Sequence, residues 1–588
     1  MAESSGEGQG AAAPGSSNSP KLKLIHEGKA QVEVSAANEV FYNPAQVVNR
    51  DLSVICIKAY HQLRWRQLQA NKANKKTRGT KRKAVGSDGP LPDQDGASPA
   101  VPPQDESSAA PVDTEQHNGT GDAHGSRAQP PAAAFRGLVD VPESHRLTVL
   151  EPLSASGLRG LRYLLELPHC VRHVIANDID PKAADTIRHN RHINNISPDQ
   201  MHVECEDASV LMYMWKRRGQ QQGKGNGADN LDIIDIDPYG SASPFLDAAV
   251  QAVKDGGMLC VTSTDMPVLA GNTPEVTFSR YGGTALKARY VHEMALRLVL
   301  HAIRTSAGRY KRSVVPLASF SIDFYVRVFV QIRNSSAETK NICKETGLVF
   351  QCVQCDTFHV VPLGETVPSK NPQGPDRFKA PHMPTHIGGT CGECGGRYTI
   401  GGPAYMGPLY QEEFVSLCLE VCKAADADDS DTLDGLTQTP RIKGMLGAVQ
   451  QEWFDLPLFY HLPSLCAKIK LQVIPLKAFK SALLHLGYRV SHFHREPQAI
   501  KTDAPPTVVH DLIRSWAKEH PPKNTKHALL QKDIMTEGID FSLHKDVSTL
   551  MGSCIREDRD ASSQAQPRWM PNPQPFWGPQ KKARSSRG

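Results

Sequence analysis

From Arg146 onward the chain alternates short apolar runs with segments of helical periodicity, and this alternation limits the possible folds more than any other feature. The runs at 147–150, 174–176, 201–205, 231–236 and 258–262 predict strands. Segments 158–167 and 245–254 between them predict helices. Crossovers between parallel strands are right-handed and place helices against the sheet. We therefore expect a doubly wound α/β domain.

Downstream, the pattern first extends this domain and then changes. Residues 290–305 place apolar side chains at helical spacing, which predicts a core-facing helix. Residues 324–332 alternate and are β-prone, so we expect an antiparallel strand that closes the edge of the sheet. Loops, two cysteine pairs and helical stretches such as 476–486 follow Cys343. The sequence thus predicts a first domain over residues 31–335 and a second, α+β domain over 340–545.

Three segments have compositions that cannot bury enough apolar surface to fold. We expect a disordered tail over residues 1–30, a disordered insertion in the first domain over about 72–134, and a disordered basic tail over 556–588. The string KKTRGTKRK in the insertion fits either a solvated linker or a nuclear-import signal. The basic residues near the chain end are candidates for RNA contacts: Lys581, Lys582, Arg584 and Arg587.

Charge and hydropathy exclude several classes of protein. No apolar run approaches the roughly 18 residues of a membrane span, so no membrane association is expected. The first twenty residues contain two Glu and neither Lys nor Arg, which argues against a signal peptide or a mitochondrial presequence. Thirteen Cys, an odd number, fit reduced intracellular thiols. Together with the basic run these features favour the nucleus, with the mitochondrion and the cytoplasm as alternatives.

The residues that follow each predicted strand matter most, because an open parallel sheet binds ligands outside the carboxyl ends of its strands. The first strand leads into EPLSASGLRG, whose glycines permit a tight turn. Asp178 follows the second strand, where an acid can hydrogen-bond ribose hydroxyls. Asp207 and Ala208 follow the third strand and are placed to contact adenine. Together they predict an adenosine-containing cofactor, although a lone acid at a strand end is more often a helix cap.

The fourth strand ends in IIDIDPYG, the most specific string in the chain. A carboxylate at Asp237 is suited to hydrogen-bond an exocyclic base amine and take its proton. Pro238 fixes the turn, and Tyr239 offers a ring on which a flipped base can stack. This combination predicts methyl transfer from a sulfonium donor to a nucleic-acid base, with Asp237 as the catalytic residue. The alternative is a turn closed by Asp and Pro beside a packed Tyr.

Upstream, the segment VFYNPAQVVNRD carries two aromatic residues ahead of a basic one. Phe41 is placed to form the other side of a base sandwich, and Arg50 to bind a cofactor carboxylate through two hydrogen bonds. Ordinary packing and a surface charge are the alternative interpretation of this segment.

Two CxxC pairs, CVQC and CGEC, have the spacing of metal ligands. They are Cys352 with Cys355 and Cys391 with Cys394, with 35 residues between the pairs. Four thiolates suit tetrahedral zinc, and the glycines beside the second pair suit a tight knuckle turn. We expect a structural zinc site, with four free thiols as the alternative. His382 and His386 are further candidate ligands in this region.

The ordered set VFYNP, NRD, SASGLRG, NDID, EDA, DIDPYG and TSTDMPVLAG resembles the tRNA (guanine(26)-N(2))-dimethyltransferase family across roughly residues 30–545. The resemblance implies a Rossmann-like class I S-adenosylmethionine-dependent methyltransferase domain joined to a family-specific C-terminal domain that binds tRNA. It also implies transfer of two methyl groups, one after the other, to the exocyclic N2 of guanosine 26.

The resemblance also implies roles for individual residues. At the cofactor it places Arg50, Arg159, Asp178, Asp207 and Ala208. Asp237 would contact the acceptor amine, with Phe41 and Tyr239 around the base. Arg162, one helical turn after Arg159, is an alternative for its role. The insertion departs from the family core, and the C-terminus has no CCCH finger such as some animal members carry, so RNA affinity would come from elsewhere.

Two other functions fit the same residues. An amino-methyltransferase acting on adenine or on ribosomal RNA would use the same acid and the same turn. A catalytically inactive tRNA-binding protein or chaperone would keep the fold, although it has no reason to retain Asp237 together with both strand-end acids. The expected partner is tRNA, and no obligate protein partner is evident from the sequence.

Overall fold

The computed structural model describes residues 22–35, 42–84, 137–221, 231–369, 376–426 and 433–547, together with two short strands, β18 (Cys554–Ile555) and β19 (Gln566–Pro567). Phe41, most of the predicted insertion and the basic residues at the chain end lie outside the described residues. The chain divides into two compact units, residues 65–137 and all the rest. The larger unit holds every candidate site residue that the structure describes.

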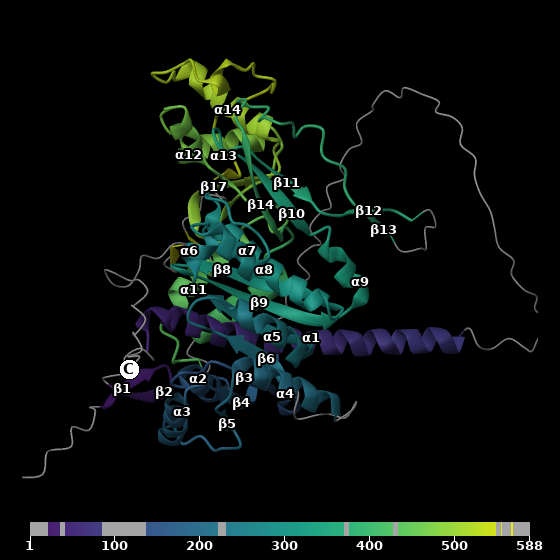
Figure 1. Ribbon diagram of the computed structural model, residues 1–588, viewed down its shortest axis with the longest axis vertical. Helices are drawn as coiled ribbons and strands as arrows, with labels where there is room; N and C mark the ends of the chain where they lie inside the picture. The colour runs from purple at the N-terminus through teal and green to yellow at the C-terminus, as the bar shows by residue number, and fades with distance from the viewer. Residues whose placement is uncertain are drawn as a thin grey trace, which may run out of the picture. The chain divides into compact units, whose positions relative to one another are not determined.

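A seven-stranded sheet forms the centre of the larger unit, in the order β5-β4-β3-β6-β7-β9-β8 (Figure 1). Its strands are β3 (Leu147–Glu151), β4 (Val171–Asn177), β5 (Met201–Glu204), β6 (Leu231–Ile236), β7 (Val253–Ser263), β8 (Arg312–Ile322) and β9 (Tyr325–Asn334). The first five are mutually parallel where they pair. This confirms the strands predicted from the apolar runs and the doubly wound α/β fold.

The predicted edge strand was wrong in one respect. β9 is antiparallel, but it lies between β7 and β8, so β8 forms the edge of the sheet. Pro316 and several polar residues interrupt the apolar pattern of β8, and the register shifts beside that proline. Proline is tolerated in edge strands because it cannot donate to a second neighbour. Pro316 and the polar residues suit β8 to the edge of the sheet, and they are also the reason why the sequence pattern did not predict this strand.

Helices lie against the sheet and connect its strands. They are α2 (Leu158–Glu166), α3 (Pro181–Ile193), α4 (Ala208–Gln221), α5 (Leu246–Ala252), α6 (Met266–Leu269), α7 (Pro274–Tyr281) and α8 (Val291–Gly308). The predicted core-facing helix is α8, which contacts β8 on one side and β14 (Tyr398–Tyr405) on another. These contacts on two sides explain why α8 is buried almost all round instead of along one stripe.

Secondary structure in the N-terminal segment begins before residue 30 and continues beyond residue 72, the two bounds that were predicted from composition. A hairpin of β1 (Leu22–Glu27) and β2 (Ala30–Ser35) contacts α2 and α3, so ordered structure starts before residue 30. Helix α1 (Val47–Ala84) continues past the predicted start of the insertion at about residue 72. Low hydrophobicity argues against a core but not against a helix, and this stretch is rich in Lys, Arg and Ala, which are good helix formers.

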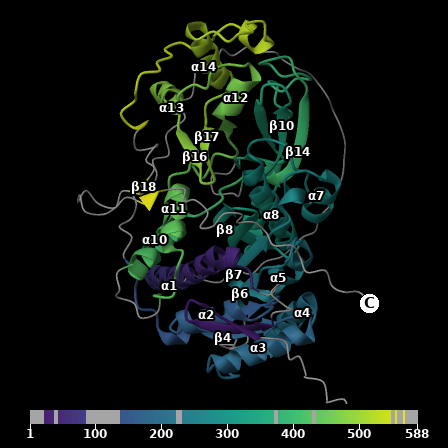
Figure 2. The ribbon, with the colours of Figure 1, turned by 90° about the vertical axis from the view of Figure 1, so that its left-hand side faces the viewer.

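The C-terminal half adds small sheets and helices. They are β10 (Thr346–Cys352), β11 (Phe358–Pro362), β12 (Glu365–Val367), β13 (Arg377–Lys379), α10 (Glu412–Asp426), α11 (Thr439–Gln450), β15 (Tyr460–His461), α12 (Leu462–Lys468), α13 (Leu476–His485), β16 (Val490–Phe493), β17 (Glu496–Thr502) and α14 (Pro506–Glu519). Figure 2 shows α10 and α11 beside the N-terminal part of α1. There, Cys56 Sγ and Cys418 Sγ are 3.9 Å apart, and Asp51 accepts hydrogen bonds from the backbone of residues 437 and 438.

The predicted boundary between two domains at 335–340 does not separate two cores. Apolar side chains from Ala404 to Phe459 join the core of the seven-stranded sheet, whereas most of a second core comes from residues 460–529 and the four candidate zinc ligands. Arg297 of α8 donates hydrogen bonds to the carbonyls of Tyr405 and Gly407, both at 3.0 Å. The C-terminal half is therefore built onto the seven-stranded sheet.

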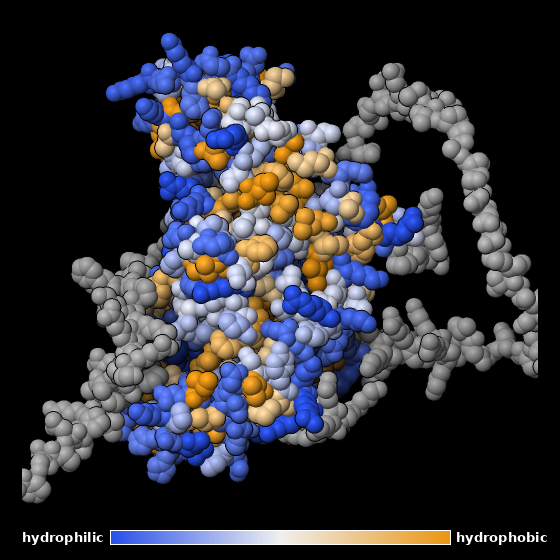
Figure 3. Space-filling model, viewed as in Figure 1, coloured by the Kyte–Doolittle hydropathy of each residue, from blue (hydrophilic) through white to orange (hydrophobic). Residues whose placement is uncertain are grey.

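None of the helices in the described ranges combines the length and the apolar content that crossing a membrane requires. The face of the molecule in Figure 3 is largely hydrophilic, with hydrophobic side chains gathered in small groups.

Candidate active site

The carboxyl ends of β3, β4 and β5 are tied together by one buried amide. Asn177 Nδ2 donates hydrogen bonds to the carbonyls of Pro152 and Glu206, both at 2.9 Å, and its Oδ1 accepts from the Glu206 N–H at 3.0 Å. Asn177 was not among the predicted site residues, although an Asn at the end of a buried strand is a signal that could have identified it. Asn177 fixes the relative position of the loops that carry the predicted cofactor residues.

Asp178 shapes the turn after β3. Its Oδ2 accepts a hydrogen bond from the Ala155 N–H at 2.9 Å, and its Oδ1 accepts from Asp180 N–H at 3.0 Å. The same turn contains Gly157 in the left-handed region, with φ of 76°, where glycine carries little strain. Asp178 is half-buried and lies where the sequence analysis placed it, at the mouth of the sheet.

Asp207 caps helix α4. Its Oδ1 accepts hydrogen bonds from the N–H groups of Ser209 and Val210, at 2.9 and 3.0 Å, as expected for a cap. Ala208 beside it is buried. A further candidate missed from the sequence is Ile179, which is 65% exposed directly after Asp178. A large exposed apolar side chain beside a strand-end acid suits contact with a flat, apolar ring face.

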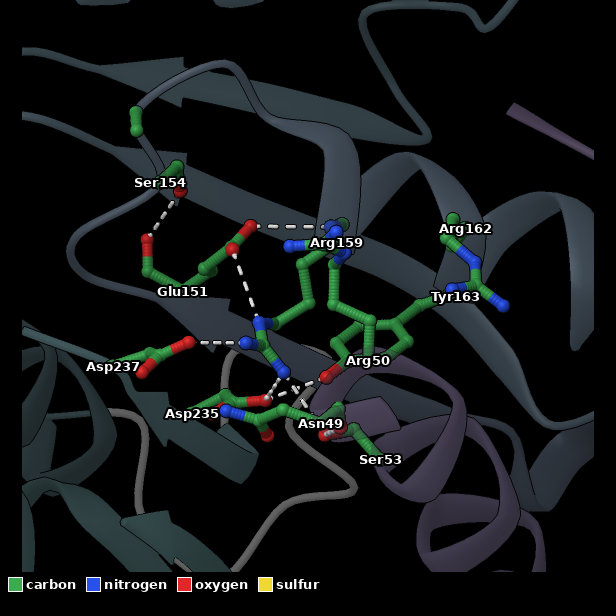
Figure 4. Close-up of polar contacts among 12 residues, drawn as sticks. Asn49, Arg50, Ser53, Glu151, Ser154, Arg159, Arg162, Tyr163, Asp235 and Asp237 are labelled. Carbon is green, nitrogen blue, oxygen red and sulfur yellow. Dashed lines mark hydrogen bonds and ion pairs between the residues drawn. The ribbon is translucent and has the colours of Figure 1, made fainter. Parts of the chain in front are cut away.

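Asp237 is held by Arg159. The Arg159 Nη2 donates a short hydrogen bond to Asp237 Oδ2, and its Nη1 donates to Ser53 Oγ at 2.9 Å (Figure 4). In the part of the chain that the structure describes, Asp237 Oδ1 has no protein partner. The Asp237 side chain is 20% exposed, whereas Arg159 is almost fully buried. One carboxylate oxygen is thus fixed by the protein while the other is left for a substrate.

A buried network continues from Arg159 beneath the site. Asp235, on the same strand as Asp237, accepts two hydrogen bonds from Arg327 at 2.8 and 2.9 Å and one from the Tyr163 hydroxyl at 2.5 Å. Burial lowers the pKa of the Arg159 guanidinium, but the negative charges of Asp235 and Asp237 outweigh this effect, so the pKa is raised. Burial raises the pKa of Glu151 to about 8 although Arg159 opposes this. The network thus sets two arginines, Arg159 and Arg327, among three carboxyl groups, those of Glu151, Asp235 and Asp237.

Tyr239 presents its ring beside Asp237. It is 63% exposed, and the loop is fixed by Gly240, whose N–H donates to Thr264 Oγ1 at 2.8 Å. Desolvation, followed by the negative charges of Asp237 and Asp178, raises the pKa of Tyr239, while the Arg50 charge lowers it. Among the predicted residues, the direct contact is that of Arg159 with Asp237, which joins one predicted cofactor residue to the predicted catalytic residue.

Arg50 and Arg162 belong to a different buried network. Arg50 donates from Nε and Nη2 to both carboxylate oxygens of Glu27 and also contacts the Asn43 carbonyl. Arg162 pairs with Glu27, Asp51 and Glu166, at 2.8, 2.7 and 2.6 Å. Arg162 is therefore no alternative to Arg159, which faces Asp237. The Glu27 carboxylate occupies the guanidinium edge of Arg50 that was predicted to bind a cofactor carboxylate.

The four cysteines of the CxxC pairs converge. Their sulfur atoms lie within 4.8 Å of one another, and all four side chains are buried. The Sγ atoms of Cys352 and Cys394 are 3.5 Å apart, and those of Cys355 and Cys391 are 3.6 Å apart. Zn–S bonds of about 2.3 Å place tetrahedral sulfurs about 3.8 Å apart, so the donor set fits zinc. His382 and His386 are exposed and stand outside this group.

The cysteine cluster is connected to helix α14. Glu393, inside the second CxxC pair, pairs with Arg514 and with Lys532, the latter at 3.0 Å. Thr357, two residues after Cys355, forms a hydrogen bond of 2.7 Å with His510 Nε2. The cluster therefore anchors the last helix of the second core.

The sheet order, the acids after adjacent strands and the carboxylate followed by an exposed tyrosine are those of a Rossmann-like methyltransferase. The model of the family "N2,N2-dimethylguanosine tRNA methyltransferase" matches residues 21–514. The chain belongs to this family.

Relatives and a solved structure agree with this assignment. The chain is 38% identical over 562 residues to the human tRNA (guanine(26)-N(2))-dimethyltransferase, covering 95% of this chain and 77% of the relative. It is 36% identical to the enzyme of the same name from Schizosaccharomyces pombe, covering 95% and 92%. A structure described as Trm1 from Pyrococcus horikoshii with S-adenosyl-L-methionine shares the fold, with 22% identity, a TM-score of 0.55, and coverage of 83% of this chain and 98% of that chain.

Proposed function

We propose that this chain transfers two methyl groups, one after the other, from S-adenosylmethionine to the exocyclic N2 of guanosine 26 in tRNA. The observation that carries the proposal is the Asp237 carboxylate, which has one oxygen held by Arg159 and lies beside the exposed ring of Tyr239. Membership of the N2,N2-dimethylguanosine tRNA methyltransferase family supplies the acceptor base and the number of methyl groups.

Asp237 orients the guanine amine and accepts its proton. The N2 lone pair is delocalised into the purine ring, so a carboxylate that draws on an N–H proton increases its availability for attack. The bond between N2 and the methyl carbon forms as the bond from that carbon to sulfur breaks, and the proton passes to Asp237. After the first transfer one N–H remains on N2, and Asp237 accepts this second proton once it has released the first to solvent.

S-adenosylmethionine, when bound, supplies a methyl group that is already activated by the sulfonium charge. Asp178 is placed to hold its ribose hydroxyls, and Ile179 to cover one face of its adenine. Asp207, which caps α4, and Ala208, its first residue, are proposed to contact the adenine. Arg159 and Arg50 supply positive charge near the methionine end, although each already pairs with a protein carboxylate.

Tyr239 and Phe41 are proposed to hold the extruded base between two rings. Stacking on an aromatic side chain is worth about 1–3 kcal/mol per base, enough to offset part of the cost of unstacking guanine. The C-terminal half is proposed to bind the rest of the tRNA, with a zinc ion held by Cys352, Cys355 and the second cysteine pair. This ion would be structural because four thiolates leave no position open for water.

The test is an assay of the purified chain with labelled S-adenosylmethionine on tRNA transcripts that carry guanosine or adenosine at position 26. We expect N2,N2-dimethylguanosine by mass spectrometry from the first transcript and no incorporation in the second. Equal incorporation into both, or methylated adenosine, would assign the site to another base. Nuclear localisation is also proposed from the basic run, and its test is the distribution of a tagged chain with and without residues 75–83.

A further inference from the structure

Ser53 joins two arginines beneath the proposed active site. Its Oγ accepts a hydrogen bond from Arg159 Nη1 at 2.9 Å and another from Arg327 Nη2 at 2.8 Å, and it donates to the Asn49 carbonyl at 2.7 Å. A hydroxyl offers one donor and two acceptor positions, so all the hydrogen-bonding capacity of Ser53 is used. The residue is fully buried. Two guanidinium groups, each carrying a full positive charge, thus meet at one oxygen.

Asp235 supplies the negative charge that permits this arrangement. It binds Arg327 through both carboxylate oxygens, while Arg159 Nη1 stands 3.7 Å from its Oδ2. Because Arg327 binds both carboxylate oxygens of Asp235, Arg159 forms its close ion pair with Asp237 instead. Arg327 also donates to Thr262 Oγ1 at 2.8 Å, which fixes its guanidinium on the β7 side.

We propose that Arg327 and Ser53 are positioning residues for methyl transfer: by engaging Asp235 and the free side of Arg159, they hold the Arg159 guanidinium against one oxygen of Asp237. The other oxygen then faces the guanine amine. Neither residue touches the substrate, and each acts through Arg159. This inference rests on the proposed function, because it assigns Asp237 as the group that meets the acceptor.

Other charges surround Asp237 and have to be weighed in any pH experiment. The charged and titratable groups that face it are Arg159 of α2, Asp235 of its own strand, Glu151 of β3, Tyr325 and Arg327 of β9, Tyr239 of its own loop, and, further out, Asp178 and Arg50. Of these, Asp235 and Glu151 also pair with Arg159, at 3.7 and 3.8 Å, and Asp235 shares the Nη1 side of its guanidinium.

The test compares the pH dependence of kcat in Arg327→Met and Asp235→Asn. In Arg327→Met, Asp235 loses its partner and draws Arg159 away from Asp237, so the acidic limb of the kcat profile moves to higher pH by about one unit. In Asp235→Asn, Asp237 becomes the main partner of Arg159, and the limb moves to lower pH. Loss of folding alone does not produce opposite shifts. Unchanged limbs, or shifts in the same direction, would overturn the proposal.

Two further variants guard against loss of folding. The double variant Arg327→Met with Asp235→Asn removes both charges, so we expect a kcat closer to that of the wild type than in either single variant. Ser53→Ala keeps helix α1 intact and removes two hydrogen bonds to charged groups, so kcat should fall by about ten- to a hundredfold with the S-adenosylmethionine Kd little changed. Arg304→Met is the matched control, because Arg304 is another buried arginine, bound to the Val314 carbonyl far from Asp237 in the chain.

A measurement without catalysis separates this proposal from the proposed function. We expect the effects of Arg327→Met and Asp237→Asn on the unfolding equilibrium constant to be non-multiplicative by at least about fivefold, because both act on Arg159. Multiplicative effects would overturn the positioning role even in an active enzyme. A wild-type chain that fails to methylate tRNA while showing this coupling would instead refute only the proposed function.

Discussion

Replacing Arg162 by Met should destabilise the chain strongly without removing any residue of the proposed active site. Arg162 is fully buried among Glu27, Asp51 and Glu166, whose side chains are at most 4% exposed. Removing one partner of a buried ion pair costs about 3–5 kcal/mol, because it leaves a buried charge uncompensated. Total stability is about 5–15 kcal/mol, so this loss is a large fraction of it.

The structure indicates where this cost concentrates. Glu27 keeps both of its hydrogen bonds from Arg50, and Asp51 keeps two backbone N–H donors in residues 437 and 438. Among the described residues, Glu166 keeps only the Lys29 N–H at 3.3 Å. We therefore expect Glu166→Gln, combined with Arg162→Met, to recover about half of the lost free energy of unfolding.

The penalty should also depend on pH. Burial raises the pKa of Asp51 and of Glu166 even with Arg162 present, and Arg162 opposes both shifts. A carboxyl group whose pKa is raised by folding stabilises the folded state at low pH, and this contribution is lost as pH rises through the folded-state value. The variant should thus lose less stability near pH 5 than near pH 8.

Urea denaturation followed by circular dichroism at both pH values measures these quantities. Arg188→Met is the matched control, because Arg188 pairs with Asp185 on the surface, where both side chains are largely exposed, and should cost at most about 1 kcal/mol. If Arg162→Met cost no more than this control, or cost more at low pH than at high pH, the reasoning from buried charge would be refuted.

Three further predictions concern the metal, the base and the cofactor. Serine at both Cys352 and Cys355 should abolish bound zinc and expose the second core to early proteolysis; elemental analysis of the wild type that finds no zinc would contradict this. Tyr239→Ala should lower kcat/KM for tRNA by about ten- to a hundredfold while Tyr239→Phe stays near the wild type, since stacking requires the ring and not the hydroxyl. Asp178→Ala should weaken S-adenosylmethionine binding by about tenfold or more in calorimetry, and an unchanged Kd would remove Asp178 from the cofactor site.

The strands of the sheet and the cysteine cluster could be predicted because each depends on residues that are close together in the sequence. The apolar runs from Arg146 onward predicted strands β3 to β7, because a parallel strand that is buried on both faces must be apolar whatever surrounds it. The CxxC spacing gave a cysteine cluster because each pair builds its own knuckle. Strand β8 was missed because Pro316 interrupts its pattern, and its position at the edge depends on β9.

The partners of the candidate site residues were beyond local prediction. Ser53 and Arg327 meet across 274 residues of sequence, and neither lies in a recognisable motif. Asp237 was identified from its own turn, but its pairing with Arg159 depends on the angle at which α2 leaves β3. The choice between Arg159 and Arg162 likewise required the structure, because one helical turn separates a side chain facing Asp237 from one buried beneath the N-terminal hairpin.

The most direct test of the central claim is single-turnover methylation of tRNA by Asp237→Asn, with Asp185→Asn on the surface of α3 as the control. Asparagine keeps the shape of the side chain but cannot take a proton, so we expect the rate of methyl transfer to fall by about a hundred- to ten-thousandfold while S-adenosylmethionine and tRNA still bind. A rate within about threefold of the wild type would show that another group receives the proton from guanine.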